Sequence, residues 1–239
     1  MEGKYFNFTD VIGYGWRVMR ANLWFFVVLV FVWLIITFIP TVIDIIAAHF
    51  LPRTATAFEV LNIATTILAF VINIVLVIGM IKIALSFCDE RKPTIGTLFD
   101  VWGCFWRYVA AGILYTLIIL GGTILLIIPG IIWAIKYSLC YYFVIDKGLG
   151  PVQAIKASGR TTMGVKWELF GFYILCGLIN LLGVLCLLVG IFATYPTVIV
   201  ATALVYRQLI AQTPELAEFG IITPSAEPAS EPLPVERES

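Results

Sequence analysis

The sequence predicts an all-α integral membrane protein with six transmembrane helices, paired as three hairpins, and with short amphipathic interfacial helices on the cytoplasmic face. Two observations on composition predict the membrane class: apolar residues make up 61% of the 239 residues, and charged residues only 13%. Soluble domains carry about 45–50% apolar and about 25% charged residues, whereas the mean hydropathy here is +1.01. Long stretches without charge then predict the number of spans.

Four stretches contain no Asp, Glu, Lys or Arg, namely 21–43, 60–81, 108–135 and 169–206. A helix crosses the hydrocarbon core with about 20 apolar residues, so the first two stretches each fit one crossing. The last two are too long for one crossing, and Pro129-Gly130 and Tyr195-Pro196 are the natural breaks within them. The sequence therefore predicts six spans, at 22–48, 58–87, 108–128, 130–146, 167–190 and 195–212.

The distribution of basic residues predicts the orientation of these spans. With the N-terminus in the cytoplasm, 13 of the 15 Lys and Arg residues fall on the cytoplasmic side, Arg53 alone falls outside, and Lys136 lies within a span. Because cytoplasmic loops carry the excess of Lys and Arg, both termini are predicted to be cytoplasmic. The first apolar run is too long for a cleaved signal peptide and is expected to remain as an anchor.

Three regions follow from these spans: an N-terminal segment at 1–21 with an amphipathic helix, a membrane domain at 22–212 and a tail at 213–239. The tail contains five prolines, six glutamates and one arginine. A segment of this composition has too little apolar surface to bury for folding, so the tail is predicted to be disordered.

A short amphipathic stretch precedes the first span and recurs twice along the chain. Within 8–20, Trp and aliphatic residues fall on one face of a helix, and charged residues fall on the other. A shift of 90 positions repeats this stretch with five identities: Asp10/Asp100, Val11/Val101, Gly13/Gly103, Trp16/Trp106 and Arg17/Arg107. A further shift of 53 gives a weaker copy that contains Arg160 and opens with Gly150-Pro151. The pattern predicts either three copies of one unit or convergence of interfacial helices.

Arg17, Arg107 and Arg160 are the candidate lipid-headgroup residues. A helix with an aromatic face and an Arg face lies in the interface plane of a bilayer. There, a planar guanidinium can bind two phosphate oxygens. The simpler interpretation is that these helices anchor each hairpin. The more specific interpretation is that they form a lipid-headgroup site beneath the bundle. Both predict membrane lipids as partners.

Few ionisable residues lie at membrane depth, and each is a candidate site because a charge there is costly. Lys136 follows the outer bend by six residues, about 9 Å along a helix. Asp44 lies about as deep, so an ion pair between the two is predicted, with an ion or proton step as the functional alternative. Glu168 and Arg207 lie near the inner ends of spans five and six and are predicted to pair likewise.

Asn73 and Asn180 lie in the middle of spans two and five. An amide bond between them would hold two helices together, and binding of a polar solute is the alternative. His49 is the only histidine, and the five cysteines show no CxxC spacing, so the sequence predicts no metal site. HExxH, GxSxG and P-loop motifs are absent as well, and we predict no catalytic residue and no cofactor.

Two stretches carry a family resemblance. One runs from Ile128-Pro129-Gly130 through Asp146 to Ser158, and the other runs from Gly183 to the exit Tyr206-Arg207-Gln208-Leu209. Over roughly 95–210 the chain resembles uncharacterised prokaryotic multi-pass membrane proteins, which are similar to the membrane domain of glycerophosphoryl diester phosphodiesterases. The resemblance implies a multi-helix fold in a bacterial or archaeal plasma (inner) membrane. It supplies no catalytic residues, since no phosphodiesterase domain is expected in this chain.

The expected function is that of a non-enzymatic accessory or lipid-interacting membrane protein. A formal net charge of zero produces no global field for nucleic acid, and other membrane proteins or a second copy of the chain stay open as partners. The alternative is a small transporter or permease-like subunit, and an intramembrane enzyme comes third. Transport predicts a polar cavity that reaches Lys136, Asn73 and Asn180, whereas the accessory interpretation predicts that contacts sequester these groups.

Overall fold

The computed structural model describes residues 4–50, 56–185 and 190–220, and their regular secondary structure is helical, with no strand. The predicted all-helical class is thus confirmed over these ranges. In chain order the elements are α1 (Phe8–Ala21), α2 (Leu23–Phe50), α3 (Thr56–Cys88), η1 (Ile95–Leu98), α4 (Phe105–Leu125), α5 (Ile127–Lys136), α6 (Cys140–Lys147), α7 (Pro151–Thr161), α8 (Lys166–Leu185), α9 (Ile191–Ala211) and η2 (Pro214–Phe219).

Five helical segments of the described chain are long and apolar enough to cross a membrane, as expected of a multi-pass membrane protein. They are α2, α3, α4, the α5–α6 segment Ile127–Lys147, and α8. The predicted sixth span at 195–212 falls almost wholly within α9, a helix of 21 residues. α9 is not among the five because polar residues, including Tyr195, Arg207 and Gln208, lower the mean hydropathy of this helix.

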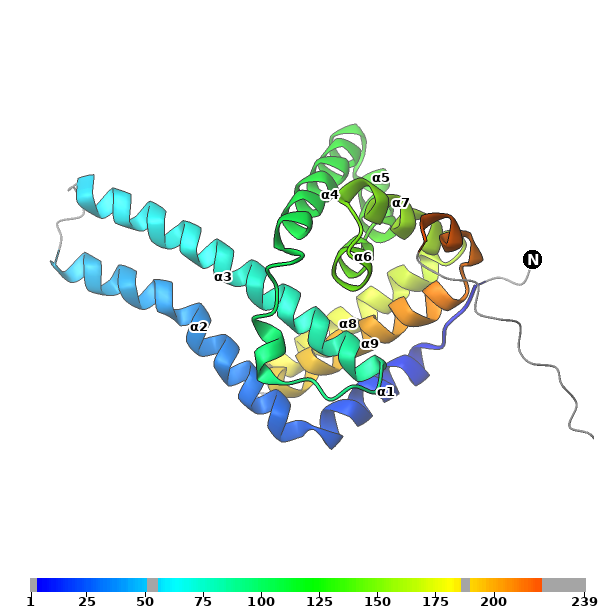
Figure 1. The fold of residues 1–239 in the computed structure, drawn as a ribbon, viewed down its shortest axis with the longest axis horizontal. Helices are drawn as coiled ribbons and strands as arrows, with labels where there is room; N and C mark the ends of the chain where they lie inside the picture. Colours follow the sequence, from blue (N-terminus) through cyan, green and yellow to red (C-terminus); the bar gives the residue numbers. More distant parts are fainter. Residues whose placement is uncertain (1–3, 51–55, 186–189, 221–239) are drawn as a thin grey trace, which may run out of the picture.

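The helices pack as pairs that meet in a common body. α2 lies against α3, α4 against α5, and α8 against α9. Figure 1 shows the α2/α3 pair projecting from the body as a long arm, while the α4/α5 pair leaves the body in a different direction. The body forms where α1, the second half of α3, α6, α7 and α9 contact one another.

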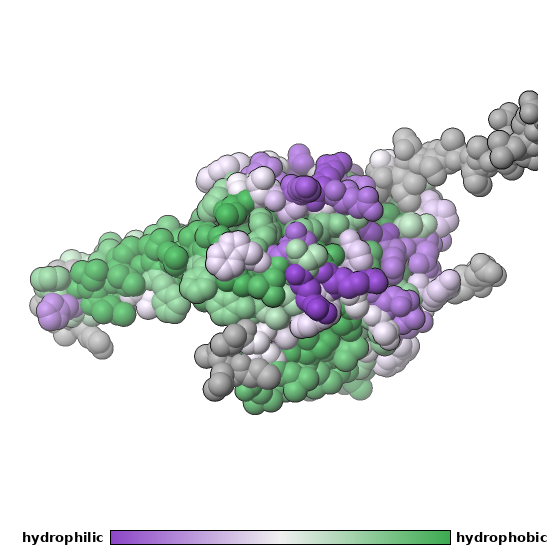
Figure 2. All heavy atoms as spheres, turned by 90° about the horizontal axis from the view of Figure 1, so that it is seen from below, coloured by the Kyte–Doolittle hydropathy of each residue, from purple (hydrophilic) through white to green (hydrophobic). Residues whose placement is uncertain are grey.

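The buried core lies in this body, and the far ends of the helix pairs are exposed. Leu76, Ile83, Phe143 and Tyr206 are among the largest fully buried side chains. By contrast, the five consecutive aliphatic residues at the α4–α5 turn, 124–128, are 65–78% exposed. Figure 2 shows hydrophobic side chains over the α2/α3 arm and hydrophilic ones gathered over the opposite half of the molecule. An exposed apolar surface of this extent is typical of a surface that contacts a partner rather than water, and membrane lipid is a suitable partner.

Glycine permits the close contact between α1 and α9. A Cβ on Gly15 would overlap the backbone oxygen of Thr197 and would lie 3.3 Å from the Ala201 nitrogen. α1 buries Val11, Gly15 and Met19, one residue per turn, and leaves its charged residues exposed. The amphipathic helix predicted at 8–20 is therefore present.

The second amphipathic stretch is not a continuous helix, contrary to the prediction. The segment between η1 and α4 runs as loop and turns, and α4 begins at Phe105, which places Arg107 in its first turn. Leu98 and Val101 are fully buried. They approach α3 closely because Gly79 has no side chain: a Cβ at this position would overlap the Leu98 backbone. Burial of these two side chains in the core therefore holds the segment as a loop. The third stretch does form a helix, α7, which begins at Pro151.

The helix breaks also differ from the prediction. α4 ends at Leu125 and the extended residue Leu126 makes the turn, so Pro129 lies in the first turn of α5, where its missing N–H needs no partner. The predicted fourth span is divided, because α5 ends at Lys136 and α6 begins only at Cys140. Pro196 lies inside α9, so the break between α8 and α9 precedes that helix.

The start of the tail is folded, although the sequence predicts disorder from residue 213. Pro214 opens the short helix η2, which packs on α7. Thr213 and Leu216 are fully buried. Leu216 finds an apolar surface on the body, which the composition of the tail alone does not reveal. Residues 221–239 lie outside the described residues.

Candidate functional site

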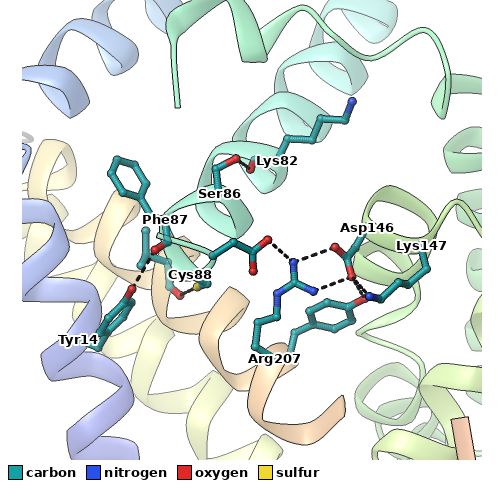
Figure 3. A network of polar contacts seen from close by, with 11 residues as sticks. Tyr14, Lys82, Ser86, Phe87, Cys88, Asp146, Lys147 and Arg207 are labelled. Atoms are coloured by element: carbon teal, nitrogen blue, oxygen red, sulfur yellow. Dashed lines mark hydrogen bonds and ion pairs between the residues drawn. The ribbon is translucent and has the colours of Figure 1, made fainter. Parts of the chain in front are cut away.

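A cluster of charged side chains joins three helices through Arg207 (Figure 3). Nη1 and Nη2 of Arg207 donate to Oδ2 and Oδ1 of Asp146 at 2.8 and 2.9 Å, and Nη2 also donates to Asp89 Oδ2 at 2.7 Å. Arg207 belongs to α9, Asp146 to the last turn of α6, and Asp89 directly follows α3. A planar guanidinium suits this bidentate contact with a carboxylate.

Two further groups complete this Arg207 cluster, which comprises Asp89, Asp146, Lys147, Tyr206 and Arg207. The Tyr206 hydroxyl donates to Asp146 Oδ2 at 3.0 Å, and Lys147 Nζ lies 3.4 Å from the same oxygen. Two carboxylates therefore face two cations. The side chains of Arg207 and Asp146 are only 23% and 12% exposed, so solvent screens their attraction less than that of a surface pair.

The Arg207 cluster is suited to hold helices together rather than to transfer protons. Both oxygens of Asp146 accept from the guanidinium of Arg207, so the lone pairs of this carboxylate are already engaged. Within the ranges that the structure describes, no group of three or more His, Cys, Asp or Glu side chains is placed to hold a metal ion. We interpret the cluster as the contact that fixes α3, α6 and α9 to one another.

The predicted pair of Glu168 and Arg207 does not form. Arg207 pairs with Asp146 and Asp89 instead. Glu168 lies in the first turn of α8, and its Oε2 is buried without a hydrogen-bond partner among the described residues. The pair fails because Arg207 on α9 faces α3 and α6 rather than α8, although α8 and α9 are neighbours.

The predicted pair of Asp44 and Lys136 does not form either. Asp44 accepts a hydrogen bond from Thr65 Oγ1 at 2.6 Å, across the α2/α3 pair. Lys136 Nζ lies 5.0 Å from the centroid of the Tyr137 ring. The two residues belong to different helix pairs, which diverge from the body (Figure 1).

The predicted amide bond between Asn73 and Asn180 is likewise absent from the described part of the chain. Asn73 is exposed on α3, and Asn180 Oδ1 on α8 is buried without a hydrogen-bond partner there. α3 packs mainly on α2 and α9, whereas α8 packs mainly on α9 and α5. The two amides therefore lie on helices of different pairs.

The three candidate headgroup arginines lie on three different helices. Arg17 is exposed on α1, Arg107 is exposed in the first turn of α4, and Arg160 is half-buried in the last turn of α7. Arg107 Nη1 donates to the carbonyl oxygen of Gly148 at 2.9 Å. This bond ties the start of α4 to the end of α6 while the side chain stays at the surface.

Three apolar helices each carry a tryptophan at their second position, a regularity that the sequence pattern alone does not reveal. Trp24 in α2, Trp106 in α4 and Trp167 in α8 are 76–78% exposed. Each has a cation within four residues, namely Arg20, Arg107 and Lys166. Because α2, α4 and α8 are the first members of the three pairs, these tryptophans mark the same end of each pair. The three tryptophans share a position relative to the helix start, and this regularity can be recognised only when the helix bounds are known.

An apolar cavity of about 450 Å³ lies between α3, α4 and α6. We call it the α3/α4 groove. Its lining includes Phe70 and Ile74 from α3, Ile113 and Leu117 from α4, and Tyr141 from α6. Lys136, Asn73 and Asn180 do not line it, so this cavity is not the polar one that the transport interpretation predicts.

A second, more polar hollow of about 540 Å³ lies where the N-terminal segment crosses the end of α9, with Lys4, Asn7 and Gln208 in its lining. The Gln212 side chain accepts from the Tyr5 backbone nitrogen at 2.9 Å and donates to the Tyr5 oxygen at 3.0 Å. Lys4 Nζ donates to the backbone oxygen of Arg160 at 3.0 Å. Burial lowers the pKa of Lys4, against the opposing effect of Glu215. These bonds tie the N-terminal segment to α7 and α9.

Comparison with known proteins finds no relative: no family model, no curated protein and no solved structure matches this chain. The family resemblance therefore stays a prediction, and the function is proposed from the geometry above.

Proposed function

We propose that this chain is a non-enzymatic, lipid-interacting accessory protein that crosses the plasma (inner) membrane six times. The observation that carries the proposal is the exposed tryptophan at the second position of α2, α4 and α8, each close to a cation. Tryptophan concentrates at headgroup depth, and Lys and Arg beside it can bind lipid phosphates. Each basic residue near an anionic leaflet adds roughly 1 kcal/mol of attraction.

In this proposal the three helix pairs are hairpins that enter the bilayer from the end marked by the tryptophans. That end carries Arg107, Lys166 and the Arg207 cluster, whereas the chain has no charged residue between Arg107 and Lys136, where the α4/α5 pair turns back. An excess of Lys and Arg marks the cytoplasmic side, so both termini lie in the cytoplasm. α1 and α7 then lie along the interface, and the plasma membrane follows from the resemblance to prokaryotic multi-pass proteins.

A small transporter is the second candidate, and two buried polar atoms favour it. Glu168 Oε2 and Asn180 Oδ1 have no hydrogen-bond partner among the described residues, and a polar solute would satisfy them. Twelve residues separate the two on α8, about 18 Å along the helix, so one small solute cannot bind both. The apolar lining of the α3/α4 groove also disfavours transport of a polar solute through it.

The lipid proposal is tested by changing Arg17, Arg107 and Arg160 together to Gln. We expect retention of phosphatidylglycerol by the full chain in detergent to fall by up to about a hundredfold, because three cations near headgroups each add about 1 kcal/mol and about 1.4 kcal/mol corresponds to a factor of ten. Native mass spectrometry with equimolar phosphatidylglycerol and phosphatidylcholine measures this retention.

The matched control changes Arg91, Lys92 and Lys156 to Gln, which removes the same charge from exposed positions without a neighbouring tryptophan. A smaller loss in the control supports specific headgroup contacts. An equal loss in both variants, or full retention in the first, would contradict the proposal.

A further inference from the structure

The α3/α4 groove is open toward the surface that we assign to lipid. Phe70, Ile113 and Leu117 line it and are still 59–63% exposed. α3 and α4 touch only near the body, and Figure 1 shows the two helices diverging beyond it. The volume of about 450 Å³ falls within the range of sites for small ligands, about 300–1,000 Å³.

One face of α4 supplies most of the lining. Its members recur with helical spacing: Tyr108, Val109, Gly112, Ile113, Thr116 and Leu117. From Tyr108 to Leu117 the helix rises about 14 Å. That length is close to one leaflet of a hydrocarbon core about 30 Å thick. Gly112 lies in the middle of this face, where the missing side chain keeps the groove hollow.

Two hydroxyl groups in the groove have no hydrogen-bond partner among the described residues. The Tyr115 hydroxyl, next to the groove, donates to the Ala134 backbone oxygen at 3.1 Å. The ring centroids of Tyr108 and Tyr141 lie 4.9 Å apart, with the ring planes tilted by 34°, but within the described chain neither hydroxyl makes a hydrogen bond. A hydroxyl in an apolar environment is costly unless it is bonded, so these two donors call for an acceptor from outside the chain.

A cation lies one residue before the groove lining along α4, although its side chain is not part of that lining. Arg107 directly precedes Tyr108 and is exposed, and among the described residues only its Nη1 is engaged, by Gly148. Trp106 beside it is 76% exposed and marks headgroup depth. Along the axis of α4 the order of groups is therefore a cation just outside the groove, then the hydroxyl donors of the lining, then its apolar side chains.

We propose that the α3/α4 groove binds one acyl chain of an anionic glycerophospholipid from the cytoplasmic leaflet. The chain lies along the apolar face of α4, an ester carbonyl accepts from Tyr108 or Tyr141, and the phosphate contacts Arg107. This order of phosphate, ester and chain matches the order of groups along the axis of α4. The inference rests on the proposed lipid-interacting function and names the ligand of one site within it.

Filling the groove is the first test. Gly112→Phe places a ring on the groove face, where a Cβ would meet Tyr141 Oη at an ordinary 3.6 Å. Gly121→Phe is the matched control, because it adds the same ring to an open position of the same helix. With delipidated full chain and phosphatidylglycerol, native mass spectrometry should show one bound lipid fewer for Gly112→Phe than for wild type or the control. Equal lipid numbers in all three proteins would overturn the inference.

The hydroxyl groups provide a second test with little change in packing. Wild type should retain diacyl phosphatidylglycerol several-fold better than its dialkyl ether analogue, which has the same headgroup and no ester carbonyl. Tyr108→Phe combined with Tyr141→Phe should remove this difference. Equal retention of both lipids by wild type would overturn the assignment of the hydroxyls.

The two proposals fail in different ways. If Gly112→Phe keeps all its lipids while the triple arginine variant loses anionic retention, the groove inference is wrong and the lipid-interacting function stands. If neither variant loses lipid, both are wrong.

Discussion

The guanidinium of Arg207 satisfies two carboxylates from two other elements, Asp146 in α6 and Asp89 after α3. Charges that are largely withdrawn from water are stable only while they are paired, and removing one partner leaves the others uncompensated. Five donors in one plane let Arg207 serve both acids at once. A lysine at the same position would keep the charge but would lose the bidentate geometry.

Arg207→Lys is therefore expected to lower the free energy of unfolding by about 1–3 kcal/mol, the usual worth of a hydrogen bond to a charged group. Thermal unfolding of the full chain in one detergent measures the change. Arg91→Lys, at an exposed loop position, is the control and should leave the unfolding temperature unchanged. Equal stability of both variants would show that the Arg207 cluster does not fix the helices.

At the scale of elements, the contact between α1 and α9 depends on the absence of one side chain. Gly15 lies against the α9 backbone, whereas a Cβ on Gly13, on the other side of α1, would have no atom within 4 Å. Both glycines are helical, so they share the same backbone preference. Only the neighbour across the helix distinguishes them.

Gly15→Val should push α1 away from α9 and destabilise the body by about 1–3 kcal/mol, the usual cost of overpacking. Gly13→Val carries the same change in helix propensity and should have a much smaller effect. Unfolding by heat in detergent compares the two. If Gly13→Val were as damaging as Gly15→Val, the loss would reflect helix propensity and not the close contact.

For the whole molecule, the buried core lies at the end of the helix pairs that carries the cations, and the distal ends expose aliphatic side chains. In water, this arrangement would leave the aliphatic side chains of the distal ends in contact with solvent. In a bilayer the exposed arms contact lipid, and the charged body stays at the interface. The proposed orientation therefore follows from where charge is absent as much as from where it occurs.

A single cysteine at position 53 tests this orientation. With the five native cysteines changed to Ala, Arg53→Cys should react with a membrane-impermeant maleimide in intact cells, because the first hairpin is proposed to turn outside. Arg91→Cys should react only in inverted vesicles. The reverse pattern would place the termini outside and would overturn the proposed topology.

Much of the fold can be predicted from the sequence, whereas little of the candidate site can. The charge-free stretches predict six spans, and five helical segments of the described residues are long and apolar enough to cross a membrane. The Gly150-Pro151 signal predicts the start of α7. The partners of Asp44, Lys136, Glu168 and Arg207 are all wrongly predicted. Depth along a helix can be counted from the sequence, but the neighbour at that depth depends on how the pairs are arranged.

Membrane class, helical content and the location of apolar segments are encoded locally, because each depends on the residues within one stretch of about 20 and on their affinity for oil over water. Which carboxylate meets Arg207, which hydroxyls face the α3/α4 groove, and where the Leu98–Val101 loop enters the core depend on contacts between segments far apart in the chain. Those contacts arise from the packing of helix faces in three dimensions, and hydropathy carries no information about them.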